Sequence, residues 1–260
     1  MSLRPGRLNR RQPFRAPRRR ILVVCEGKKT EPLYFRALIR EEALKLVEVV
    51  IDDKSGVPKT LVERSIHLKK DAARDAKREG DDFLRYDAVW CVFDVDSHPN
   101  LPEAKQQARD NGVNLAISNP CFELWLLLHF QDHTAFIDRK KLQRACSERM
   151  PGYKKEAPYE VLRGTYEEAV ARAESLERRH NRDGSPGENP STDVFKLTTV
   201  LMSEGRESQL RIARTRSEAH VGGQPLAVSK PGKKPATAAS RRRDKAGRRG
   251  RRLGFRPLSF

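Results

Sequence analysis

The sequence predicts an α/β fold, in which a parallel β-sheet is flanked by helices and followed by a helical C-terminal part and disordered basic tails. Short apolar runs at residues 21–25, 87–93 and 113–118 have the composition of strands covered on both faces. Helical patterns separate these runs, and such a β-α-β alternation is typical of a parallel sheet. After residue 120, the patterned segments are helical.

The first half of the chain alternates between predicted strands and helices. The run at residues 21–25 is a strand that ends at Glu26, a turn follows at Gly27, and Thr30 is a suitable N-cap for the next helix. That helix is predicted over residues 31–46. Further strands are expected at residues 47–51, 87–93 and 113–118, and further helices at residues 60–79 and 99–111.

The second half of the chain is predicted to be helical. Residues 121–130 are apolar nearly all round, which indicates a buried helix that a single acid, Glu123, interrupts. Helices are also expected over residues 139–148 and 157–180. A polar loop at residues 181–190 then leads to a last helix, which is capped by Ser191 or Thr192 and ends near residue 202.

Basic residues are concentrated at the two ends. Residues 1–20 contain eight arginines and no acid, and residues 204–260 contain sixteen Lys and Arg against four Asp and Glu. Both segments lack apolar periodicity, so we predict a disordered arm and a disordered tail. Between them we expect an α/β domain at 21–135 and its helical extension at 136–203. The basic ends would strengthen nucleic-acid binding in a salt-dependent way, or are simply solvated.

The chain shows no sign of membrane insertion or of disulfides. No run of 18 apolar residues occurs, and the apolar stretch after the N-terminal arginines is too short for a secretory signal. The four cysteines, at positions 25, 91, 121 and 146, are widely spaced and form no CxxC pair. We therefore expect reduced thiols in a cytoplasmic protein without membrane contact.

Acidic residues follow two of the predicted strands. Glu26 and Asp94 come directly after apolar runs, and Asp96 points to the same side as Asp94 in extended chain. If the two strands are neighbours, the carboxylates converge at the carboxyl edge of the sheet, and Mg²⁺ or Mn²⁺ would relieve their repulsion. The alternative is that the aspartates serve only as turn and cap residues.

Other residues are candidates for the same site. Glu123 would be costly to bury unpaired, so it either ligates a second ion or forms a structural ion pair. His129 is a candidate acid, base or ligand, although it could equally be a structural histidine. Four residues are candidates for substrate contact on account of their charge or their position after a strand, and these are Lys28, Lys29, Asn119 and Lys154.

The chain resembles the RloB-like family over residues 20–203, and the resemblance is carried by three motifs that follow one another in the sequence. They are Val24-Cys25-Glu26-Gly27 with Thr30-Glu31-Pro32, Phe93-Asp94-Val95-Asp96, and Ser118-Asn119-Pro120-Cys121-Phe122-Glu123. The resemblance implies a divergent Toprim-type catalytic domain at 21–135, the fold shared by topoisomerases, primases and overcoming-lysogenisation-defect nucleases. It also implies that Glu26, Asp94 and Asp96 match the Toprim glutamate and its pair of aspartates, which hold divalent ions for phosphodiester chemistry.

The leading hypothesis is therefore a Mg²⁺- or Mn²⁺-dependent nuclease that acts on DNA or RNA. The resemblance further implies a role in bacterial antiviral defence, and it leaves open a homodimer or partner proteins of a defence locus. Two alternatives remain at this point. Residues 93–97 superficially resemble the nucleophile motif of haloacid-dehalogenase-like phosphatases, in which the first aspartate attacks phosphorus. The protein could also be a non-catalytic nucleic-acid-binding adaptor whose acids are structural.

Overall fold

A computed structural model describes residues 19–42, 44, 48–52, 57–95, 100–150, 153 and 159–221 of the chain. Its strands are β1 (Arg20–Cys25), β2 (Glu48–Asp52), β3 (Ala88–Asp94), β4 (Asn114–Asn119) and β5 (Ser191–Thr192). Its helices are α1 (Thr30–Glu41), α2 (Pro58–Glu79), the short 3₁₀ helix η1 (Asp82–Leu84), α3 (Leu101–Asp110), α4 (Glu123–Leu128), α5 (Arg139–Arg149), α6 (Tyr159–Arg163), α7 (Tyr166–Arg182) and α8 (Val194–Val221).

The described strands form one sheet in the order β2-β1-β3-β4-β5. The first four are parallel, with Cys25 opposite Val92 and Asp94 opposite Ser118, and only the two-residue β5 runs antiparallel to its neighbour. The α/β fold with a mostly parallel sheet is thus confirmed. Because β1 lies directly beside β3, the carboxyl ends of these two strands meet at the same edge.

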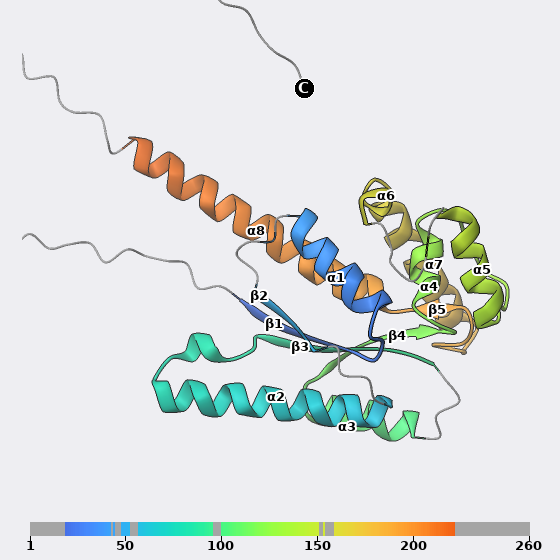
Figure 1. Ribbon diagram of the computed structural model, residues 1–260, viewed down its shortest axis with the longest axis horizontal. Coiled ribbons are helices and arrows are strands. Elements are labelled where there is room, and N and C mark those ends of the chain that lie inside the picture. Colours follow the sequence, from blue (N-terminus) through green and yellow to red (C-terminus); the bar gives the residue numbers. More distant parts are fainter. Residues whose placement is uncertain are drawn as a thin grey trace, which may run out of the picture.

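Helices cover both faces of the sheet (Figure 1). On one face, Leu22 and Val24 of β1 pack in a cluster with Leu61 of α2 and Ala104 of α3. The opposite face is covered by α1 and α8, and helices α4 to α7 gather beside the end of β4 (Figure 1). Since both faces are buried, the strands read in the sequence as unbroken apolar runs rather than as alternating ones.

One helix predicted in the second half of the chain is interrupted in the structure. The single helix predicted over residues 157–180 is divided into α6 and α7, with a turn at Gly164 and Thr165. Glycine is a poor helix former, and here it ends α6. Ser191 and Thr192, the two expected caps of the last helix, form β5, and the Oγ1 of Thr192 accepts a hydrogen bond at 3.3 Å from the N–H of Val194, the first residue of α8.

The prediction of a disordered tail over residues 204–260 is wrong for its first part, because α8 continues to Val221. Tertiary contacts hold the first residues of this extension. Glu204 forms an ion pair with Arg19, and Gly205 is packed so closely against Leu44 that a Cβ at this position would overlap the Leu44 side chain. The predicted arm at residues 1–20 is wrong at its end, because Arg20 is the first residue of β1. Residues 1–18 of the arm and residues 222–260 of the tail lie outside the described residues.

Two further expectations concern membranes and cysteines. Among the helices that the structure describes, none combines the length and apolar character needed to cross a membrane. All four cysteines are buried free thiols. The expectation of unpaired thiols is therefore confirmed.

Candidate functional site

The carboxyl edge of the sheet brings Glu26 and Asp94 into contact. Glu26 extends the β1 strand by one residue, since its N–H donates to the carbonyl of Val92 at 2.9 Å. Its side-chain Oε2 then accepts a hydrogen bond from the backbone N–H of Asp94 at 3.1 Å. The strand order β1-β3 therefore places these two acids side by side, although 68 residues separate them in the chain.

A third carboxylate, that of Glu31, joins them from the first turn of α1. Glu31 is only 6% exposed, and its carboxylate lies against Gly27, where any Cβ would overlap it. The tight turn after Glu26 thus requires glycine at position 27 because the space is taken by the acid. Glu31 was not among the predicted site residues, because an acid in the first turn of a helix also has an ordinary role towards the helix dipole.

Glu123 contributes a fourth carboxylate from the start of α4. It is 4% exposed, and its Oε1 accepts hydrogen bonds from Gln143 Nε2 and from the Tyr153 hydroxyl, each at 3.3 Å. Together with Glu26, Glu31 and Asp94, it lines a pocket of about 410 Å³, which we call the acidic pocket. These neutral partners do not balance the charge of Glu123.

Arg139, the first residue of α5, is the basic residue that contacts the acids. Its Nη2 lies 3.2 Å from Asp94 Oδ2 and donates to the Pro120 carbonyl at 3.3 Å. The other Asp94 oxygen, Oδ1, accepts from Phe122 N at 2.9 Å. Sequence reasoning did not find Arg139, because nothing local indicates that a helix start 45 residues beyond Asp94 reaches the sheet edge.

The acidic pocket carries more negative than positive charge. The pKa of Asp94 is raised to about 8, chiefly by burial and next by repulsion from Glu31, and the nearby Arg139 only partly opposes these effects. Burial also raises the pKa of Glu31, with smaller contributions from Glu123 and Glu26. A bound cation would stabilise this arrangement, because it would favour the ionised carboxylates that burial and mutual repulsion disfavour.

The donor set fits a hard divalent ion in its chemistry. Carboxylate oxygens are the ligands that Mg²⁺ and Mn²⁺ prefer. Within the described ranges, however, no three His, Cys, Asp or Glu side chains form a ready metal cage. One reason is that both Asp94 oxygens are directed at other groups, namely Phe122 N and Arg139. Asp96, the remaining predicted ligand, lies outside the described residues.

The residues predicted to contact the substrate differ in their positions. Lys28 and Lys29 are exposed and line the acidic pocket, and they make no ion pair within the described part of the chain. Asn119 does not line this pocket, and its Nδ2 donates to the Gly187 carbonyl at 2.9 Å, so it fixes a loop. Lys154 lies outside the described residues.

His129 is not brought to the carboxylates. It is buried beside Trp125 and does not line the acidic pocket, and its Nδ1 lies 3.0 Å from the Leu162 carbonyl oxygen. Burial lowers the pKa of His129 to about 4, so it is neutral at physiological pH. Its surroundings indicate a structural histidine.

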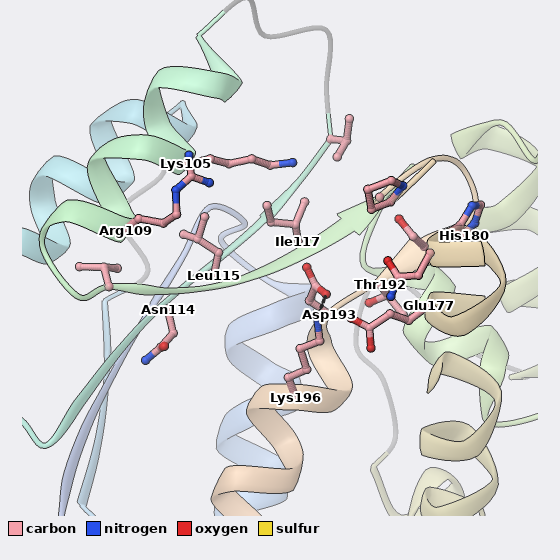
Figure 2. Close-up of a pocket in the computed structure, with 16 residues that line it drawn as sticks. Lys105, Arg109, Asn114, Leu115, Ile117, Glu177, His180, Thr192, Asp193 and Lys196 are labelled. Atoms are coloured by element: carbon pink, nitrogen blue, oxygen red, sulfur yellow. Dashed lines mark hydrogen bonds and ion pairs between the residues drawn. The ribbon is translucent and has the colours of Figure 1, made fainter. Parts of the chain in front are cut away.

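A second pocket, of about 450 Å³, lies along β4 between α3 and the start of α8 (Figure 2). Lys196 in this pocket is ion-paired with Glu177 at 2.6 Å and with Asp193 at 2.7 Å. Lys105 and Arg109 line it from α3. None of the predicted site residues lines this pocket, and the central lysine is already neutralised, so the candidate chemistry belongs to the acidic pocket.

Comparison with known proteins adds a family assignment. A family model described as RloB-like protein matches residues 21–201, which is more than half of the chain and includes all the described acids of the pocket. No curated protein and no solved structure matches the chain.

Proposed function

This chain belongs to the RloB-like protein family, and we propose that it is a divalent-metal-dependent nuclease of the Toprim type that hydrolyses phosphodiester bonds in DNA or RNA. The observation that carries the proposal is the gathering of Glu26, Glu31, Asp94 and Glu123 around one pocket at the carboxyl edge of a parallel sheet. Ligand sites of open α/β sheets lie at this edge. Residues that only cap turns would not need to share one pocket.

The acids and lysines of the pocket have separate roles in this proposal. Glu26, Asp94 and Glu123 would hold Mg²⁺ or Mn²⁺, and the resemblance adds Asp96 to them. When bound, such an ion polarises a phosphate oxygen and lowers the pKa of an attacking water. Lys28 and Lys29, exposed at the mouth of the pocket, attract the phosphodiester backbone of the substrate.

The biological setting of the proposal follows the family resemblance. We propose that the protein acts in the bacterial cytoplasm in antiviral defence. The basic residues at the two ends of the chain would raise the affinity for nucleic acid without selecting a sequence, because lysine and arginine contacts to phosphates carry no direct base information.

The two alternatives have less support from the site. A phosphatase would use Asp94 as its nucleophile, and it would leave Glu26 and Glu123, which line the same pocket, without a role. A non-catalytic adaptor would gain nothing from four carboxylates in one pocket, since they repel the phosphates it has to bind.

A cleavage assay tests the proposal directly. Purified full-length protein is incubated with labelled single-stranded DNA, duplex DNA and total tRNA in Mn²⁺, Mg²⁺ or EDTA. We expect cleavage only with a divalent ion, and a loss of at least about 100-fold in Glu26→Gln and Asp94→Ala. The control Asp110→Asn, on the surface of α3, should cut like the parent. Cleavage that persists in Asp94→Ala would overturn the site assignment.

A further inference from the structure

Arg139 occupies an unusual place for a basic residue in the acidic pocket. Its side chain is 38% exposed, yet its Nη2 reaches Asp94 Oδ2, which belongs to a side chain that is only 13% exposed. The backbone of Arg139 is held at the start of α5, where the Asp138 side chain accepts a hydrogen bond from Lys141 N at 3.0 Å. The helix therefore stays in place whether or not the Arg139 side chain moves.

The position of Arg139 also conflicts with metal binding in the present arrangement. The Asp94 oxygen that faces Arg139 is one of the oxygens that a divalent ion would need. A guanidinium group and a dication on the same carboxylate oxygen repel each other, so both cannot keep this contact at full strength. Arg139 thus acts as the counter-ion of Asp94 in the metal-free protein.

A displaced Arg139 side chain would have a natural second partner. Arg139 lines the acidic pocket, where the substrate phosphate has to lie beside the ion. The planar guanidinium group binds two oxygens of a phosphate at once, which the ammonium group of lysine cannot do. One side chain could therefore pair with Asp94 before the metal arrives and with phosphate afterwards.

We propose that Arg139 is a resident counter-ion which a divalent metal displaces from Asp94, and that the displaced guanidinium group then binds the phosphodiester of the substrate. This inference rests on the proposed nuclease function. The inference and a purely structural role for Arg139 predict opposite changes in metal affinity when Arg139 is removed. If Arg139 competes with the metal, its removal tightens metal binding, whereas if Arg139 merely orders the acids, its removal weakens metal binding.

The first measurement is Mn²⁺ binding by calorimetry, without nucleic acid, for the parent protein, Arg139→Ala and Arg139→Lys. We expect Arg139→Ala to bind Mn²⁺ about three- to tenfold more tightly than the parent, because a competing partly exposed charge is gone. Arg139→Lys keeps the charge and should stay close to the parent. Arg144→Ala is the matched control on the same helix, since Arg144 pairs with Glu148 at the surface, and it should leave Mn²⁺ affinity unchanged.

The second measurement is cleavage of a labelled oligonucleotide at saturating Mn²⁺. We expect both Arg139 variants to lose about tenfold or more in kcat/KM, although Arg139→Ala binds the metal better. Equal or weaker Mn²⁺ binding by Arg139→Ala, or full activity of Arg139→Lys, would overturn the inference while leaving the proposed function in place. A parent protein that binds no Mn²⁺ would overturn both.

Discussion

Replacement of Asp94 by asparagine should stabilise the metal-free protein. The pKa of Asp94 is raised from 3.8 to about 8, chiefly by burial. Because the native state binds the Asp94 proton more tightly than the unfolded chain does, the contribution of Asp94 to the free energy of unfolding is fully present below about pH 4 and is lost as the pH rises towards 8. A neutral asparagine at position 94 does not have this pH-dependent loss.

The raised pKa of Asp94 sets an upper limit on the stabilisation by Asp94→Asn. Between pH 3.8 and pH 7 the unfolded chain ionises at Asp94 while the native state stays mostly protonated, which lowers the free energy of unfolding by at most about 4.5 kcal/mol, at about 1.4 kcal/mol for each pH unit. Asparagine keeps an oxygen that accepts from Phe122 N, but it loses the ion pair with Arg139. We therefore expect a net gain of about 1–3 kcal/mol, which raises Tm by about 2–4 °C for each kcal/mol.

The assay is urea unfolding of the parent and Asp94→Asn in EDTA, from pH 4.5 to pH 8. The difference in the free energy of unfolding should increase across this range. Asp110→Asn is the control, because Asp110 lies on the surface of α3, where it accepts a hydrogen bond from Gln106 Nε2, and its effect should stay within about 0.5 kcal/mol. If Asp94→Asn is less stable than the parent at pH 7, or if the difference does not change with pH, the reasoning about repulsion in the pocket is wrong.

Three further predictions concern other parts of the chain. Gly27→Ala should lower the free energy of unfolding by about 1–3 kcal/mol in urea because its Cβ overlaps a buried carboxylate, whereas Gly164→Ala, which meets no atom within 4 Å, should change it by less than about 0.5 kcal/mol. His129→Asn should reduce stability by about 1–2 kcal/mol through lost packing and hydrogen bonding, while Mn²⁺ affinity measured by calorimetry stays unchanged. Deletion of residues 222–260, which include twelve Lys and Arg, should weaken oligonucleotide binding at low salt by about tenfold or more and flatten its salt dependence, with Mn²⁺ affinity unaffected. Loss of Mn²⁺ binding in either of the last two variants would contradict the site assignment.

Local sequence patterns were enough to find most strands and helices. The β-branched and apolar runs have to be buried on both faces, and this requirement is visible in the residues themselves. The extension of α8 to Val221 was missed because its support is not local. A basic, polar segment has no apolar pattern that predicts order, and its first residues are held instead by the Arg19–Glu204 ion pair and by the contact of Gly205 with Leu44.

The sequence by itself determined that Glu26 and Asp94 come at the ends of buried strands, where carboxylates are expensive unless something compensates them. Only the tertiary structure decided that β1 and β3 are neighbours, with β2 at the edge, so that these two acids touch. It also decided that Glu123 and Arg139 reach the same pocket from α4 and α5, two helices that follow β4 in the chain. The physical reason is that side-chain periodicity reports which faces are buried, whereas strand order and helix docking depend on packing between segments far apart in the sequence.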